Sequence, residues 1–140
     1  MAGNKKDVYV LDTSAILAYI EDEDGADIIE DLLIKAERNE ATIFVAFISL
    51  TEVMYITLQE KDEATAQARV DLIKSLSLTI EESNEPLNYS AARLKARNRI
   101  SLADAYIAAL CQEQNGILVH KDPEFDNLSA TVKQHRLLYK

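Results

Sequence analysis

The fold class is decided by the stretch VYVLDTS at residues 8–14, where an apolar run gives way to helical spacing. Its first four residues are apolar without a break, which is typical of a strand buried on both faces in a parallel sheet. From residue 13 the apolar side chains recur on one helical face, at Ile16, Leu17 and Ile20. A buried strand followed at once by a helix indicates an α/β protein.

The same alternation of strand and helix continues along the chain. The apolar runs predict strands at residues 8–11, 42–46, 78–80 and 117–119, with a weaker one at 136–139. Helical spacing predicts helices at residues 13–20, 24–38, 49–59, 62–75, 87–98 and 101–114. No repeat and no linker divides residues 1–140, which contain three glycines and two prolines. We therefore expect a single α/β domain of three layers with a mainly parallel central sheet.

The composition restricts the class of protein. Cys111 is the single cysteine, which excludes an internal disulfide framework and fits a reducing compartment. No apolar run approaches the roughly 20 residues of a membrane-spanning helix. The acidic residues 21–24 follow the first apolar segment at once, without the cleavage site of a signal peptide. We therefore expect a cytoplasmic protein with no membrane partner.

The net charge argues against one mode of nucleic-acid binding. The chain has 24 acidic and 15 basic residues, so its formal charge is −9 with both histidines neutral. A protein that holds nucleic acid by bulk electrostatic attraction carries the opposite sign. A phosphate-bearing substrate would need a metal ion or a local basic patch to offset this charge.

Four carboxylates follow predicted strands and begin helices. Asp12 ends the first strand, and Glu52 lies in the first turn of the helix after the second strand. Asp104 lies in the first turn of the most apolar helix, and Asp122 follows the fourth strand after a short turn. Because ligands of parallel sheets bind beyond the carboxyl ends of the strands, we expect these side chains at one rim of the domain.

Taken one at a time, these acids are better explained as helix caps. A carboxylate at a helix N-terminus accepts backbone N–H groups and meets the positive end of the helix dipole. The segment SLTE at residues 49–52 has the capping-box pattern, and Ser101 with Asp104 forms a weaker version of it. Asp12 precedes a predicted helix, and Asp122 precedes a proline, which is favoured at the first helical position.

Taken together, the four acids indicate a metal site. Asp104 has mostly apolar neighbours in its helix, and Asp12 ends a buried strand. Ionised carboxylates in such surroundings are costly unless they are paired or bind a cation, and converging carboxylates repel one another. Oxygen ligands favour Mg²⁺ or Mn²⁺ over Zn²⁺. Such an ion can activate water and screen a phosphodiester, which overcomes the objection from net charge.

Four segments resemble the motifs of PIN-domain ribonucleases, in order along nearly the whole chain. They are VLDTS at 10–14, SLTE at 49–52, SLADAYIAA at 101–109 and DPEF at 122–125. The resemblance is nearest to the small VapC-type toxins of toxin–antitoxin pairs, and the segment at 101–109 is its most specific part. It implies a PIN-like fold and a Mg²⁺- or Mn²⁺-dependent endoribonuclease that forms a homodimer and is silenced by an antitoxin protein.

The resemblance also implies roles for individual residues. Its metal-binding and catalytic acids would be Asp12, Glu52, Asp104 and Asp122. Thr13 or Ser14 would support the first of them by hydrogen bonding, and Glu124 matches an acidic position beside the fourth. The chain departs from the family at His120, where members often have Thr or Ser. For this residue, a hydrogen-bonded structural histidine is the favoured interpretation.

A cluster of basic residues precedes the segment at 101–109. Arg93 and Arg97 share one face of the predicted helix, and Arg99 follows it. With Lys121, these arginines are candidate RNA contacts that would lead phosphates to the metal site. The alternative is a solvated basic surface that complements the end of the helix.

Two further functions are compatible with part of this pattern. A PIN-domain nuclease of RNA processing would need no antitoxin, and a non-catalytic PIN-like binding module would keep the fold without a productive metal. The presence of all four acids favours catalysis over the binding module. Aspartyl-phosphate phosphatases, a third class, carry a second Asp two residues after the first, where this chain has Ser14.

Overall fold

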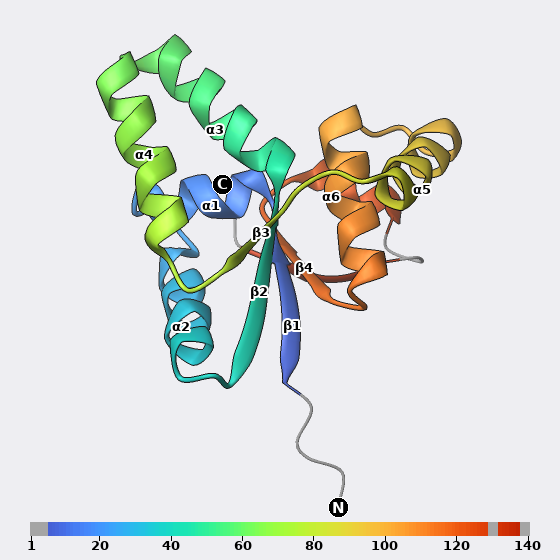
Figure 1. Ribbon diagram of the computed structural model, residues 1–140, viewed down its shortest axis with the longest axis horizontal. Coiled ribbons are helices and arrows are strands. Elements are labelled where there is room, and N and C mark those ends of the chain that lie inside the picture. Colours follow the sequence, from blue (N-terminus) through green and yellow to red (C-terminus); the bar gives the residue numbers. More distant parts are fainter. Residues whose placement is uncertain (1–5, 129–131, 138–140) are drawn as a thin grey trace, which may run out of the picture.

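The computed structural model describes residues 6–128 and 132–137 and centres on a five-stranded sheet (Figure 1). The strands are β1 (Asp7–Leu11), β2 (Ala41–Ala46), β3 (Thr79–Glu81), β4 (Ile117–His120) and β5 (Lys133–Arg136). Their order across the sheet is β3-β2-β1-β4-β5, and each neighbouring pair is parallel. The predicted parallel sheet is therefore confirmed.

Helices cover both faces of this sheet. They are α1 (Thr13–Ile20), α2 (Ala26–Glu37), α3 (Phe47–Glu60), α4 (Glu63–Ser75), α5 (Glu85–Arg97) and α6 (Leu102–Glu113), with a 3₁₀ helix, η1 (Pro123–Leu128), after β4. In Figure 1, α1 and α2 lie on one side of the sheet and α5 and α6 on the other, while α3 and α4 form a pair that projects beyond it. The predicted three-layer α/β arrangement is confirmed.

The position of β1 explains why its sequence is apolar without a break. Val10 and Leu11 are both buried, but they belong to different cores. Val10 lies in the core that contains Ile107 of α6, whereas Leu11 lies in the core that contains Ile16 of α1 and Ile29 of α2. A strand covered on both sides needs apolar side chains at successive positions.

One helix start differs from the prediction. The SLTE segment predicts a capping box, but α3 begins at Phe47, and its N-cap residue Ala46 offers no side-chain cap. The helix starts earlier because Phe47 and Ile48 pack against the core that contains α6. Ser49 is consequently buried within the first turn and does not cap it. The capping-box prediction is wrong.

The remaining differences concern the ends of elements. The last strand is β5, at residues 133–136, where the sequence predicts a strand at 136–139. Residues 138 and 139 of that predicted strand lie outside the described residues. Three predicted caps are present, since Asp12 accepts the Ala15 N–H, Ser101 accepts the Asp104 N–H, and Asp122 accepts the Glu124 N–H at the start of η1.

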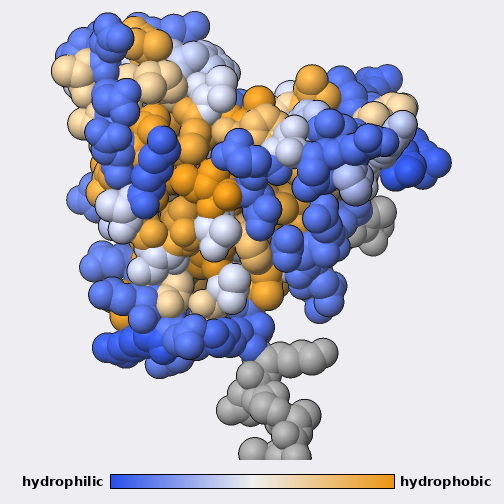
Figure 2. Space-filling view, viewed as in Figure 1, coloured by the Kyte–Doolittle hydropathy of each residue, from blue (hydrophilic) through white to orange (hydrophobic). Residues whose placement is uncertain are grey.

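Apolar surface gathers in the middle of the view in Figure 2, where Figure 1 has β2 and β3 between the α3–α4 pair and the α5–α6 pair. On the described surface as a whole, the large apolar side chains that are exposed are Ile34, Tyr55, Leu58, Leu72, Tyr89 and Leu102. Within the described residues, none of the helices has both the length and the apolar character needed to cross a membrane.

Candidate metal centre

The carboxyl ends of β1 and β4 mark the point where the chain order of the sheet reverses. From β1 the chain adds β2 and β3 on one side, and it later adds β4 and β5 on the other. Open parallel sheets bind ligands at such a switch point. Asp12 follows β1 directly and Asp122 lies two residues after β4, so both acids reach this point.

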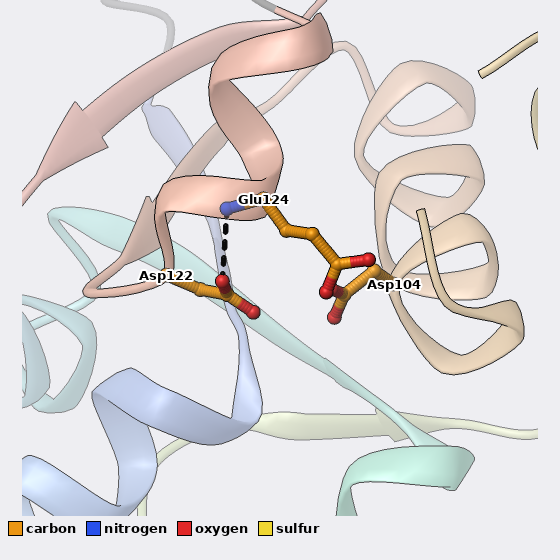
Figure 3. A group of neighbouring side chains, drawn as sticks. All are labelled: Asp104, Asp122 and Glu124. Carbon is orange, nitrogen blue, oxygen red and sulfur yellow. Dashed lines mark hydrogen bonds between the residues drawn. The ribbon is translucent and has the colours of Figure 1, made fainter. Parts of the chain in front are cut away.

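Three carboxylates meet beside the switch point (Figure 3). Asp104 of α6, Asp122 of the loop after β4 and Glu124 of η1 each offer one oxygen, and these oxygens all lie within 4.8 Å of one another. In Figure 3 the carboxylates of Asp104 and Glu124 lie next to each other, and that of Asp122 faces them. Glu124, expected as a supporting residue beside the fourth acid, is a full member of this acidic group.

Hydrogen bonds from the backbone hold the acidic group. Glu124 Oε1 accepts the Ser101 N–H at 2.8 Å, and the Glu124 N–H donates to Asp122 Oδ1 at 2.9 Å. Ser101 also caps α6 by accepting the Asp104 N–H at 3.1 Å. The starts of α6 and η1 are fastened to each other by these bonds, which fixes the three carboxylates relative to one another.

Asp12 borders the acidic group from the end of β1. It is 2% exposed, and its Oδ1 accepts the Ala15 N–H at 2.9 Å. The Ser14 hydroxyl lies 2.8 Å from each of the two carboxylate oxygens of Asp12 and accepts the Lys121 N–H at 2.8 Å. Ser14 therefore joins the ends of β1 and β4 and holds the Asp12 carboxylate in one orientation.

Burial and mutual repulsion raise the pKa values of two of these carboxyls. Burial raises the pKa of Asp12 from 3.8 to about 7, and the charge of Asp122 adds to the shift. Burial also raises the pKa of Asp104 from 3.8 to about 9, with further contributions from Asp122, Glu124 and Asp12. The ionised form of the site is therefore unfavourable without a positive charge.

That positive charge does not come from an ion pair within the described residues. The ion pairs found there use other carboxylates, those of Glu21, Glu23 and Asp126. Clustered carboxylates without a basic partner hold protons or bind a cation. Oxygen donors of this kind suit Mg²⁺ and Mn²⁺. The residues present therefore fit a divalent cation.

Glu52 lies at the edge of the centre. It belongs to the second turn of α3, and its Oε1 accepts the Thr13 hydroxyl at 2.6 Å. The Thr13 oxygen also lies 3.1 Å from the hydroxyl oxygen of buried Ser49. Because Thr13 follows Asp12 in the chain, this bond brings Glu52 near the acidic group, although Glu52 is not one of the three acids within 4.8 Å.

Comparison with known proteins identifies the family. The family model for the PIN domain matches residues 9–130. The chain belongs to the PIN-domain family. No curated protein sequence matches it.

Solved structures share the fold of this PIN domain. It is similar to VapBC2 from Rickettsia felis bound to a promoter DNA fragment, with a TM-score of 0.75, 20% identity, and coverage of 94% of this chain and 99% of that chain. DNA-bound VapBC from Salmonella typhimurium gives a TM-score of 0.73, 16% identity, and coverage of 93% and 98%. VapC20 from Mycobacterium tuberculosis, a sarcin–ricin loop cleaving toxin, gives a TM-score of 0.66 and 16% identity. The match covers 89% of this chain and 95% of that chain. At these identities the likeness concerns the fold.

The basic residues of this PIN domain differ in what they contact. The Lys121 ammonium donates to the Asp24 carbonyl at 3.0 Å and lies 3.9 Å from Glu23 Oε1. It therefore faces the loop between α1 and α2. Arg93 and Arg97 border a hollow of about 240 Å³ beside α6. The arginine side chains are exposed, whereas Lys121 is engaged by the acidic loop, and its role as an RNA contact stays a prediction.

His120 and Gln134 surround the loop that carries Asp122. His120 is fully buried, its Nδ1 accepts the Asp122 N–H at 3.1 Å, and its Nε2 lies 2.8 Å from Gln134 Oε1. Burial lowers the pKa of His120, which favours the neutral ring. The expected hydrogen-bonded structural histidine is consistent with these contacts. The sequence does not predict a role for Gln134, because β5 (KQHR) has no alternation of polar and apolar residues that would distinguish one position from the next.

Proposed function

We propose that this PIN domain is a divalent-metal-dependent endoribonuclease that hydrolyses RNA phosphodiesters with metal-activated water. The observation that carries the proposal is the acidic group, in which Asp104, Asp122 and Glu124 lie within 4.8 Å. Buried Asp12 adds to its negative field, and the ion pairs of the described residues lie elsewhere. Membership of the PIN family supports nuclease activity.

The cation would be held by carboxylate oxygens. Asp12, Asp104, Asp122 and Glu124 are the proposed ligands, and Glu52 approaches them through its hydrogen bond to Thr13. An all-oxygen set favours Mg²⁺ or Mn²⁺. When bound, such an ion supplies positive charge to the scissile phosphate and lowers the pKa of the attacking water.

The residues of the chain supply position and proton transfer. Ser14 and the Ala15 N–H keep the Asp12 carboxylate in one orientation, and the Ser101 N–H does the same for Glu124. A preorganised carboxylate set needs little rearrangement when the substrate arrives. One carboxylate of the set acts as the general base that accepts the proton of the attacking water.

Exposed arginines are the proposed contacts to the RNA strand. Arg93 and Arg97 lie on α5, and Arg99 lies in the connection to α6. The hollow that Arg93 and Arg97 border also includes Gln112, which is eight residues along α6 from Asp104, or about 12 Å at the helical rise. The guanidinium group suits phosphate because it offers several donors in one plane. An RNA strand could therefore contact these arginines and the acidic group together.

We further propose that the nuclease is the toxin of a VapBC-type pair. Support comes from the folds that it resembles, since the structures from Rickettsia felis and Salmonella typhimurium are VapBC complexes and VapC20 is described as a toxin. The apolar surface in Figure 2 fits a protein partner, because exposed apolar patches mark interaction sites. We therefore expect an antitoxin protein as a partner, and a homodimer in solution.

A cleavage assay with a matched variant tests the nuclease proposal. The wild type and Asp104→Asn are incubated with structured and unstructured RNA, in Mn²⁺ and in EDTA. We expect cleavage by the wild type in Mn²⁺ only, because the amide of Asn keeps the shape of the side chain but binds the ion poorly. Cleavage in EDTA, or an equal rate for Asp104→Asn, would contradict the proposal. A folded wild type without activity would favour the non-catalytic binding module.

A further inference from the structure

We infer that His120 and Gln134 are positioning residues that set the carboxylates of Asp122 and Glu124 for the metal ion. The inference rests on the proposed function, because it concerns the same centre. Neither side chain belongs to the acidic group. Both act through backbone groups of the segment at residues 122–125, which carries two of the three acids.

The first connection runs from His120 to the backbone of Asp122. A backbone N–H can only donate, and the Asp122 N–H donates to His120 Nδ1 at 3.1 Å, so Nδ1 carries no proton. In the neutral ring the proton is on Nε2, which donates to Gln134 Oε1 at 2.8 Å. Both ring nitrogens are therefore used, and the ring ties the Asp122 backbone to β5.

The second connection runs from Gln134 to η1. Its Oε1 is occupied by His120, so its amide nitrogen faces the other way and donates to the Phe125 carbonyl at 2.9 Å. The reversed amide would place two donors against each other at His120. Phe125 follows Glu124 directly, so one side chain of β5 holds both the loop with Asp122 and the helix with Glu124.

Ring packing adds to these two bonds. The Phe125 and His120 rings have their centroids 5.0 Å apart at an interplanar angle of 56°, and both residues are fully buried. The Phe125 N–H also donates to the Asp122 carbonyl at 3.2 Å. The segment at 122–125 is thus fixed from the sheet side by β5 and internally by its own turn.

The irregular segment needs this support more than the other acids do. Asp12 caps α1 and Asp104 lies in the first turn of α6, so regular helices set their positions. Asp122 and Glu124 lie on a loop and a short 3₁₀ helix, where few repeating hydrogen bonds fix the backbone. Groups that orient metal ligands typically change metal affinity or activity by about 10- to 100-fold when they are lost.

Mn²⁺ titration of the full chain by calorimetry tests the inference. Gln134→Met removes both side-chain bonds at similar length, and His120→Gln removes the acceptor at Nδ1. His120→Asn places an amide oxygen near the former Nδ1 and keeps that acceptor. His135→Asn is the matched control, since His135 is the exposed neighbour of Gln134 on β5.

We expect Gln134→Met and His120→Gln to weaken Mn²⁺ binding by about 10-fold or more. His120→Asn should recover part of that loss, and His135→Asn should bind as the wild type does. Affinities are expressed per folded molecule, with the folded fraction taken from circular dichroism. Gln134 is half-buried on an edge strand, so Gln134→Met should fold and keep the measurement decisive even if a variant of buried His120 does not fold.

The outcomes separate this inference from the proposed function. If the wild type binds Mn²⁺ and the first two variants bind it equally well per folded molecule, the inference is overturned and the metal-dependent function stands. A lower melting temperature with unchanged affinity also overturns the inference, because it shows a role in stability alone. If the wild type binds no Mn²⁺, the proposed function falls and the inference falls with it.

Discussion

Two acidic regions of this PIN domain differ in how their charge is balanced. The loop between α1 and α2 has four consecutive acids at residues 21–24, all of them exposed, and basic side chains of Arg69 and Lys121 pair with two of them. The acidic group of the metal centre combines a carboxylate of α6 with two from the segment at residues 122–124, and the described residues provide no ion pair for it. A run of acids that are consecutive in the sequence therefore forms a solvated surface here. The metal centre is instead distinguished by buried acids and by its position at the carboxyl ends of the strands.

Lys121 and Ser14 connect the two regions. The Lys121 side chain binds the acidic loop, while its backbone N–H donates to Ser14 at 2.8 Å. Ser14 in turn contacts the Asp12 carboxylate. The loop thus receives a positive charge from this residue, and the metal centre receives only a backbone dipole.

Removing one carboxylate from each region gives the largest expected difference. Asp12→Asn should lower Mn²⁺-dependent RNA cleavage by about 100-fold or more, because a lost metal ligand removes several kcal/mol of stabilisation of the reacting charge. Asn caps helices about as well as Asp, so the fold should persist. Asp24→Asn, in the loop, should retain the wild-type rate, since Lys121 binds the Asp24 carbonyl and not its carboxylate. Equal losses in the two variants, measured as initial rates on one RNA, would erase the distinction.

The pH dependence of stability without metal should separate the two regions further. The pKa values of Asp12 and Asp104 rise from 3.8 in the reference state to about 7 and about 9 in the folded state, so folding retains protons that the unfolded chain releases. The stability that these two carboxyls contribute is fully present below pH 3.8. It is lost as the pH rises through their pKa values in the folded state, about 7 and about 9. Above about pH 5 ordinary carboxyls are ionised in both states and add little.

Thermal unfolding in EDTA checks this expectation. The melting temperature of the wild type should fall as the pH is raised from about 5 to about 9, and Mn²⁺ should restore it at the upper end. The melting temperature of Asp104→Asn should fall less over the same pH range, and at high pH in EDTA it should be higher than that of the wild type. A wild type whose stability rises with pH would show that the acidic group has no excess of buried negative charge.

A smaller effect is expected for the residue that holds Glu52. Thr13→Val removes the hydroxyl that donates to Glu52 at 2.6 Å and keeps the shape of the buried side chain. We expect kcat to fall by about 10-fold with little change in KM, as for other residues that orient a metal ligand. Thr13→Ser should recover most of the rate. If Thr13→Val and the wild type share one kcat, Glu52 takes no part in the centre.

The smallest effect is expected in the acidic loop. Glu23 lies 3.9 Å from the Lys121 ammonium, and its side chain is 50% exposed. The Lys121 side chain is 13% exposed, but at this separation and with Glu23 half exposed the pair contributes about 1 kcal/mol or less. Glu23→Gln should therefore change the free energy of unfolding, measured in urea, by less than that amount. A loss of several kcal/mol would mean that the loop is not a solvated surface.

The sequence predicts the positions of three acids because the strand ends are visible in it. Apolar runs locate β1 and β4, and parallel strands end at a common edge, so Asp12 and Asp122 are expected there. Asp104 follows from a serine cap at the start of an apolar helix. These inferences use local pattern and one rule of topology, and both can be read from the spacing of the residues.

Other features depend on tertiary packing, which the spacing does not contain. The predicted start of α3 is wrong because Phe47 packs into the core and overrides the capping pattern of the next residues. Gln134 escapes prediction because its partner His120 is brought to it only by the pairing of β4 with β5. The place of Glu124 in the acidic group also depends on the contact between η1 and the start of α6.

The most direct test of the metal centre is a crystal of the protein soaked in Mn²⁺ and measured at the manganese absorption edge. We predict an anomalous peak among the carboxylates of Asp104, Asp122 and Glu124, with none in the loop at residues 21–24. A peak confined to the loop, or no peak at the acidic group under saturating Mn²⁺, would contradict the assignment of the metal centre.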